Sequence, residues 1–234
     1  MKVIFLINDL VAPNDSGPIY KETDMGRLPV EPFNTFSNLF FLGIILYFSI
    51  KLYKELKDHT FIALCLPVML ISLVGGMTYH GTRSHQFWLY LDWVPIMLLC
   101  AAVVIYFITK LTPIWWKRLL AIGLILSISF AIRNLPFPKG LRISIGYVVT
   151  ALTVLVPIVT YLVYTKGKNL KWVVAAFVIF GVAILFRSVD KITDLELFYM
   201  GTHWLWHLFG GLAVFCLMQY IYLDNLKRKP LDKN

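Results

Sequence analysis

Seven long apolar runs constrain this chain more than any other feature of its sequence. Each run has roughly twenty residues, the length of helix needed to cross the hydrocarbon core of a bilayer. A segment surrounded by lipid must satisfy its own backbone hydrogen bonds, which predicts that every run is an α-helix. The chain is only 15% charged and has a mean hydropathy of +0.72, which excludes an ordinary soluble domain. The runs lie at about 33–53, 60–80, 87–109, 114–133, 143–164, 171–188 and 199–223.

The connections between these runs are short, so neighbouring helices should pack antiparallel. We therefore predict an all-α membrane protein whose residues 1–234 form a single bundle of seven transmembrane helices. The start of the chain, residues 1–9, does not match a signal peptide, because its apolar core is too short and no small-residue cleavage site follows. No stripe of small residues indicates a dimer surface, so a monomer is expected.

The net charge of +9 would suit nucleic acid, but the positions of the charges indicate a membrane instead. In a seven-helix model, thirteen of the 22 Lys and Arg residues fall on the side of the C-terminus and nine on the other side. The positive-inside rule then predicts a cytoplasmic C-terminus and an N-terminus outside, in the inner membrane if the source is bacterial. The basic tail, residues 227–229, is expected to lie against anionic lipid heads.

Three histidines at the ends of apolar runs are candidate metal ligands. His203 and His207 are four residues apart and therefore share one helix face, while His80 ends the second run. The end of the second helix and the start of the seventh lie on the same, outer side, so the three rings could converge. Two ligands from one helix and one from another would form an open zinc site. The ordinary alternative is hydrogen bonding between helices. His59 and His85 fall in loops and are expected to be solvated.

Other polar residues occupy positions that lipid disfavours. Asp92 opens the third helix, where it is either a carboxylate stabilised by the helix dipole or a general base beside the metal. Arg187 and Asp190 end the sixth helix and are expected to form an interfacial ion pair. A polar stripe begins the first helix and indicates a lined site. Its members are Glu31, Asn34, Ser37 and Asn38.

The three cysteines lie inside apolar runs and form no disulfide pattern. We expect Cys65, Cys100 and Cys216 to be small core residues.

Taken together, these motifs resemble those of the alkaline ceramidases and their bacterial relatives. That family belongs to a larger superfamily of seven-helix membrane hydrolases that includes the adiponectin-receptor-like proteins. Three blocks carry the resemblance and together span most of the chain: residues 19–22 with 31–38, residues 75–80 with 91–95, and residues 203–207.

The resemblance implies zinc bound by His80, His203 and His207, and Asp92 as the catalytic aspartate. Where the family has a serine one helical turn before the second-helix histidine, this chain has Gly76, and Thr78 is the nearby hydroxyl.

The resemblance also implies calcium near the N-terminus, held by acidic and amide groups. Glu22 and Glu31 match parts of that site. Pro18 replaces an aspartate that bacterial relatives often carry, and Asp15 or Asp24 could compensate for it. The ion would need hard oxygen ligands.

The expected function is zinc-dependent cleavage of the amide bond of a ceramide-like membrane lipid, near the outer or periplasmic face. Two alternatives stay open. One is a membrane receptor or transporter whose histidines relay protons. The other is a haem protein, although His203 and His207 share one face and bis-histidine ligation needs opposing faces.

Overall fold

A computed structural model describes residues 12–138, 142–190 and 199–226, and these residues contain helices but no strand. The segments Met1–Asp9 and 227–229 discussed above lie outside the described residues. The eight α-helices are α1 (Pro32–Ser37), α2 (Leu39–Leu52), α3 (Thr60–Thr82), α4 (Gln86–Leu111), α5 (Trp115–Arg133), α6 (Arg142–Tyr164), α7 (Leu170–Val189) and α8 (His203–Leu226).

Seven spans long and apolar enough to cross a membrane are present in the described part of the chain, as predicted. Helices α1 and α2 together form the first span, Pro32–Leu52. The two helices are separated at Asn38, whose side-chain amide donates to the carbonyl of Asn34 at 2.8 Å. Side-chain donors of this kind compete with the backbone for helical carbonyls, which accounts for the local break.

The last helix begins four residues later than the apolar run suggests. Gly201 adopts φ +79°, a left-handed conformation that glycine tolerates and that ends the preceding turn. The carboxylate of Asp190 then accepts the backbone N–H groups of Thr202 and His203 at 2.7 and 2.8 Å. Asp190, at the end of α7, therefore caps the first turn of α8 from outside that helix.

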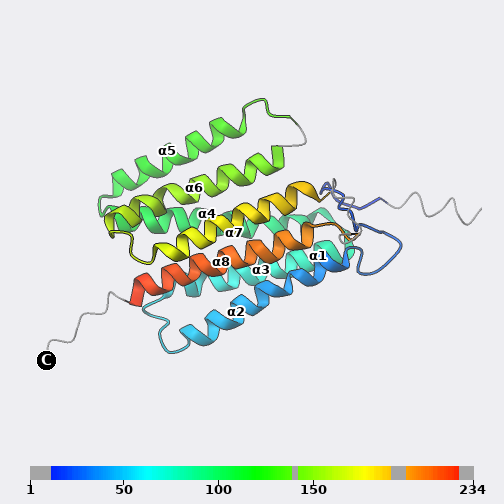
Figure 1. Cartoon of the computed structure of the whole chain (residues 1–234), viewed down its shortest axis with the longest axis horizontal. Helices are drawn as coiled ribbons and strands as arrows, with labels where there is room; N and C mark the ends of the chain where they lie inside the picture. The colour runs from blue at the N-terminus through cyan, green and yellow to red at the C-terminus, as the bar shows by residue number, and fades with distance from the viewer. Residues whose placement is uncertain (1–11, 139–141, 191–198, 227–234) are drawn as a thin grey trace, which may run out of the picture.

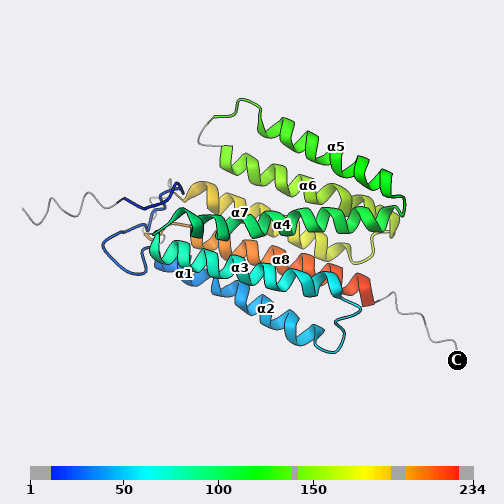
Figure 2. The same ribbon diagram turned by 180° about the vertical axis from the view of Figure 1, so that it is seen from behind.

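The helices form one elongated bundle in which α8 is central and α5 lies at the edge (Figures 1 and 2). In the most apolar window of α8, 56% of residues are buried, whereas none is buried in that of α5. The core joins α2, α3, α4, α6 and α8 through large side chains that include Phe48, Phe107, Ile158 and Ile221. The outward leucines of α5 face the surroundings, as expected in lipid.

An irregular segment, residues 12–31, covers the end of the bundle where α3 ends and α8 begins. It is held there by backbone hydrogen bonds from Val30 to Gly81 at 2.9 Å and from Glu31 to His80 at 3.0 Å. A third bond runs from the N–H of Asn14 to the carbonyl of Arg83 at 3.0 Å. We call this covered part of the molecule the histidine end, and the part where α8 finishes the far end.

The far end also holds the end of α2 and the turns that join α4 to α5 and α6 to α7 (Figure 1). The charge imbalance seen in the sequence therefore corresponds to two ends of the bundle. Basic residues described at the far end are Lys51, Lys54, Lys57, Lys110, Lys117, Arg118, Lys166, Lys168 and Lys171.

Candidate metal centre

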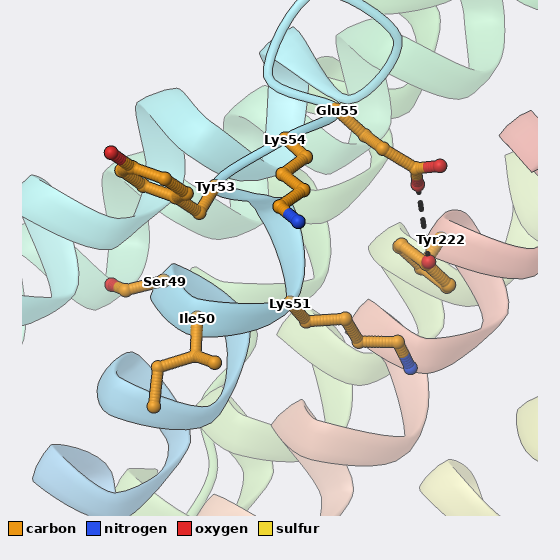
Figure 3. Close-up of a pocket in the computed structure, with 7 residues that line it drawn as sticks. All are labelled: Ser49, Ile50, Lys51, Tyr53, Lys54, Glu55 and Tyr222. Carbon is orange, nitrogen blue, oxygen red and sulfur yellow. Dashed lines mark hydrogen bonds between the residues drawn. The ribbon is translucent and has the colours of Figure 1, made fainter.

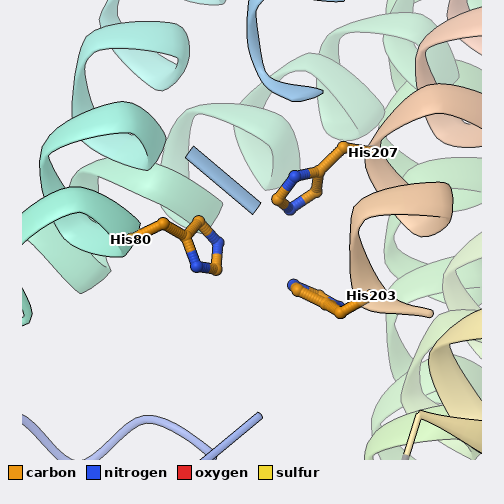
Figure 4. Close-up of side chains that lie close together, drawn as sticks. All are labelled: His80, His203 and His207. Carbon is orange, nitrogen blue, oxygen red and sulfur yellow. The ribbon is translucent and has the colours of Figure 1, made fainter. Parts of the chain in front are cut away.

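The structure brings His80 of α3 together with His203 and His207 of α8 (Figure 4). One ring nitrogen from each histidine lies within 4.8 Å of the others, close enough to share a metal ion. The three residues are 0%, 3% and 6% exposed. No other group of at least three histidine, cysteine or acidic side chains converges in this way within the described ranges. The site lies beneath segment 12–31.

His80 is oriented by a carboxylate. Its Nδ1 donates to Glu31 Oε2 at 2.5 Å, so that the other ring nitrogen, Nε2, is left for a ligand. Nε2 is buried and has no hydrogen-bond partner in the described structure. A metal-binding histidine usually donates its second nitrogen to a carboxylate or carbonyl, which fixes the ring and makes it more basic. In this protein the carboxylate that accepts from His80 is Glu31.

The Glu31 carboxylate stays ionised despite its burial. Burial alone would raise its pKa, but hydrogen bonds from His80 and Thr23 and the charge of Arg83 together lower the pKa below its ordinary value. The carboxylate is therefore an acceptor for His80 at neutral pH.

His207 is oriented by the break between α1 and α2. Its Nδ1 lies 3.1 Å from the carbonyl of Asn34 and 2.8 Å from the hydroxyl of Ser37. The amide of Asn38 is 3.4 Å away. Asn34, Ser37 and Asn38, predicted as a polar stripe, thus surround one nitrogen of one histidine and leave Nε2 for the centre. This is the same division of roles as in His80, with a carbonyl in place of a carboxylate.

His203 is held differently from the other two. Its ring stacks on Tyr20, with ring centres 3.9 Å apart and planes 16° apart, and its backbone N–H is capped by Asp190. Its Nδ1 is buried without a hydrogen-bond partner in the described structure. Burial raises the pKa of Tyr20, so the stacking partner is a neutral phenol.

These observations fit a bound metal ion. Unpaired polar atoms are costly in a protein interior, yet Nε2 of His80 and Nδ1 of His203 are both buried and unpaired. A metal ion shared among three imidazoles would satisfy Nε2 of His80, because Nδ1 of that ring is already bonded to Glu31. Three imidazoles from two helices are a donor set typical of catalytic zinc, although imidazole also suits copper, nickel and iron.

Asp92 approaches this centre from α4. That helix begins at Gln86, so Asp92 lies in its second turn. The helix dipole acts mainly on the first turn and therefore does not explain the position of Asp92. Its carboxylate lies against Gly76 of α3, where a Cβ atom would be 2.6 Å from Asp92 Oδ1 and 2.8 Å from Asn38 Oδ1. Gly76 is one helical turn before His80. The absence of a side chain there lets Asp92 reach the histidine face of α3.

Thr78 does not share that face. Two residues correspond to about 200° of rotation around a helix, so Thr78 and His80 point in nearly opposite directions. Thr78 is half-buried, and its backbone carbonyl accepts a hydrogen bond from the hydroxyl of Thr82 at 2.8 Å. The geometry therefore offers no support for Thr78 as a catalytic group.

The predicted ion pair between Arg187 and Asp190 is wrong for the described structure. Asp190 accepts backbone N–H groups of Thr202, His203 and Lys21 instead, the last at 3.3 Å. The guanidinium of Arg187 lies 5.0 Å from the ring centre of Tyr20. Both residues thus support His203 indirectly, Asp190 through the helix cap and Arg187 through the tyrosine that stacks on the ring.

Three of the acids proposed for calcium, Glu22, Asp24 and Glu31, do not converge on one point. Glu22 accepts the N–H groups of Phe33 and Asn34 at 2.9 and 2.6 Å and so caps α1, and its burial raises its pKa. Asp24 is exposed and accepts the N–H of Gly26 at 2.9 Å within its own turn. Glu31 is committed to His80 and Arg83. Calcium needs six to eight oxygen ligands around one point, and these three carboxylates do not fit it.

Sequence reasoning missed three buried residues. Tyr20, in segment 12–31, stacks on His203, and Arg83, at the end of α3, donates to Glu31. Hydropathy carries no signal at either position. His59, predicted to be solvated, is 0% exposed and stacks on Tyr222 with ring centres 4.3 Å apart. It lies at the far end and contributes nothing to the metal centre. His85 is exposed, as predicted, and its ring accepts the N–H of Phe87 at 3.0 Å.

The far end also contains a pocket of about 720 Å³ between α2 and α8, shown in Figure 3. It is lined by Ser49, Ile50, Lys51, Tyr53, Lys54, Glu55 and Tyr222. No group of three possible metal ligands lies among these lining residues.

Comparison with known proteins adds no relative. Neither a scan against models of protein families nor a search of curated protein sequences found a match to this chain.

Proposed function

We propose that this protein is a zinc-dependent membrane hydrolase that cleaves the amide bond of a ceramide-like lipid, releasing a fatty acid and an amine. The observation that carries the proposal is the convergence of His80, His203 and His207 within 4.8 Å at the end of a seven-helix bundle. Asp92, next to Gly76 on the histidine face of α3, supplies the acid–base group that hydrolysis needs. The resemblance to the alkaline ceramidases suggests the substrate.

Zinc held by the three histidines would supply Lewis acidity towards a carbonyl oxygen and a water molecule. Asp92 takes a proton from the attacking water as the new carbon–oxygen bond forms. It then gives that proton to the nitrogen when the carbon–nitrogen bond breaks, so that the products are a carboxylic acid and an amine. Glu31 and the carbonyl of Asn34 hold the rings of His80 and His207 in place during both steps.

The substrate is expected to enter sideways from the bilayer. A lipid chain already in the membrane gains little from burial in the protein, because both surroundings are apolar. Selection between lipids therefore depends on the shape of the site and on contacts with the head group. The aromatic and amide groups around His203 and His207 are the described residues available for those contacts.

The proposed orientation follows from charge. The far end carries the larger share of lysine and arginine, and the positive-inside rule assigns such an end to the cytoplasm. The histidine end would then face outwards, towards the periplasm if the protein comes from the inner membrane of a bacterium. We propose that the protein acts as a monomer, because all three histidines come from one chain.

The competing proposal is a receptor or transporter in which the histidines relay protons. It predicts function without metal and indifference to chelators. The buried, unpaired Nε2 of His80 favours the metal centre over the relay, because a relay needs hydrogen-bonded neighbours along its path.

The test is metal analysis of the protein purified in detergent without chelators, beside His203→Ala/His207→Ala. An exposed histidine, His85, provides the control substitution His85→Ala. We expect about one zinc per chain in the wild type and the control and none in the double variant. The zinc-loaded protein should hydrolyse a synthetic ceramide. Wild-type protein without any transition metal would contradict the zinc mechanism, and a Soret band would indicate haem instead.

A further inference from the structure

Arg83 is a fully buried arginine at the end of α3, three residues after His80. Its backbone adopts φ +47° and ψ +31°, the left-handed conformation in which many helices end. Glycine or asparagine normally occupies such a position, because other side chains are strained there. The arginine side chain is therefore expected to make stabilising contacts that offset this strain and that glycine could not make.

Oxygen atoms of segment 12–31 surround its guanidinium. Nε and Nη2 donate to the two carboxylate oxygens of Asp15 at 2.9 and 2.7 Å, a paired contact between two side chains that are both fully buried. Nη1 donates to Glu31 Oε1 at 2.5 Å and to the carbonyl of Pro18 at 3.2 Å. The carbonyl of Gly17 lies 3.5 Å from Nη2.

This arrangement is the environment of a bound cation. Two carboxylates and two carbonyls from a loop converge on one positive charge, and no water is needed to complete the set. Burial opposes the charge, but the hydrogen bonds to Asp15 and Glu31 and the charge of Glu31 outweigh burial and raise the pKa of Arg83. The guanidinium fork is also the geometry that carboxylates bind best.

The cluster is connected to the metal centre through one residue. Glu31 accepts from Arg83 with Oε1 and from His80 with Oε2. Arg83 therefore fixes the position and charge of the carboxylate that fixes His80. Asp15, at the other side of the guanidinium, ties the start of segment 12–31 to the same point.

We propose that Arg83 is the built-in cation of this cluster, occupying the place that a divalent ion would take among Asp15, Glu31 and the carbonyls of Gly17 and Pro18. The protein consequently needs no calcium, contrary to what its family resemblance implies. Arg83 is a positioning residue: it acts on the metal centre through Glu31 and His80. The part of the proposal that concerns metal affinity rests on the proposed function, whereas the part that concerns calcium does not.

The decisive variant is Arg83→Gly, which removes the cation and suits the left-handed backbone. Arg27→Ala is the matched control, because Arg27 also holds segment 12–31, through the carbonyls of Glu22 and Val30, but touches no carboxylate. For each protein, zinc affinity is measured by competition with a chelator. Thermal unfolding in detergent is then followed during addition of calcium, with magnesium as the ionic-strength control.

We expect wild type and Arg27→Ala to show no calcium-specific shift in melting temperature. Arg83→Gly should lose about 10- to 100-fold in zinc affinity, as is common when a partner of a metal-binding histidine is disturbed. Calcium, but not magnesium, should raise its melting temperature and restore part of that affinity, because the vacated oxygens suit a larger ion. Arg83→Lys should be intermediate in zinc affinity and insensitive to calcium, since it keeps the charge but loses the fork.

Two results would overturn the proposal: a calcium-specific stabilisation of the wild type, or a folded Arg83→Gly protein with wild-type zinc affinity. If Arg83→Gly folds only when calcium is present, that result supports the proposal. If it folds under no condition, Asp15→Asn decides, because a wild-type zinc affinity in that variant would contradict the connection through Arg83. A wild type that binds no zinc would sink the proposed function, and the calcium measurements would still test the role of Arg83.

Discussion

The two ends of the bundle each bury a histidine completely, but among the described residues only the histidine at one end belongs to a candidate metal centre. His80 and His59 are both 0% exposed. His80 faces two further histidines and a carboxylate that fixes its ring. His59 precedes α3, stacks on Tyr222 and lies 3.5 Å from Glu55, but it belongs to no group of three possible metal ligands in the described structure. Burial alone therefore does not identify a functional histidine, whereas convergence of several does.

The buried ion pairs at the two ends differ in the same way. At the far end, Lys110 pairs with Asp224 at 2.5 Å, and the hydroxyl of Tyr161 donates to the same carboxylate at 3.0 Å. That network joins α4, α6 and α8 and leads to no metal ligand. At the histidine end, the pair between Arg83 and Glu31 continues to His80. The ion pair at the far end thus joins helices only, whereas the ion pair at the histidine end also contacts a candidate metal ligand.

The largest expected difference between the ends is in metal content. His80→Ala should lose the metal and all hydrolysis, because two histidines on one helix do not complete the site. His59→Ala should keep about one metal per chain and lose only stability, on the order of 2 kcal/mol for a buried aromatic ring. Metal analysis and thermal unfolding of both variants measure the contrast. Loss of metal from His59→Ala would show that the two ends are coupled.

The next largest effect is expected at Asp92. Asp92→Asn keeps the shape of the side chain but removes its ability to carry a proton, so the rate of hydrolysis should fall about 10²- to 10⁴-fold. Zinc content should not change, because Asp92 is not among the ligands. Glu55→Gln is the matched control at the far end and should retain full activity. A variant that lost zinc together with activity would place Asp92 among the metal ligands instead.

Glu31→Gln should reduce zinc affinity without abolishing zinc binding, because Glu31 orients the ligand His80 and is not itself a ligand. The amide cannot accept from His80 and Arg83 as a carboxylate does, and zinc affinity should fall about 10- to 100-fold. Because the folded protein lowers the pKa of Glu31, its ionised form stabilises the fold at neutral pH. That contribution is lost as the pH falls below the ordinary glutamate value of about 4.3.

Unfolding of the wild type and Glu31→Gln, measured between pH 7 and pH 3, tests the sign of this shift. The stability advantage of the wild type should shrink as the pH falls. An advantage that grew in acid would contradict the ionised state of Glu31.

The sequence predicts the seven spans because apolar length is a local property, and it predicts the meeting of three histidines because antiparallel topology fixes which helix ends share a side. It does not predict the roles of Tyr20 or Arg83. Their contacts depend on the path of segment 12–31, which has no periodicity. The predicted ion pair between Arg187 and Asp190 is wrong for a similar reason. The carboxylate of Asp190 accepts backbone N–H groups at the start of α8, and this contact between helices cannot be predicted from sequence spacing.

The smallest expected effect concerns two glycines in spanning helices, Gly76 beside the metal centre and Gly43 in α2. A Cβ atom on Gly76 would be 2.6 Å from Asp92 Oδ1, whereas one on Gly43 would meet nothing within 4 Å. Gly76→Ala should therefore displace Asp92 and lower activity about tenfold, since a shift of about 1 Å in a reacting group can cost up to 10²-fold.

Gly43→Ala is the control and should remain fully active and equally stable or slightly more so, because alanine favours helix. Zinc content should be unchanged in both variants. Full activity in Gly76→Ala would show that Asp92 has room to move without consequence. The close approach of α4 to the histidine face of α3 would then be a feature of packing, as at the far end, and not of catalysis.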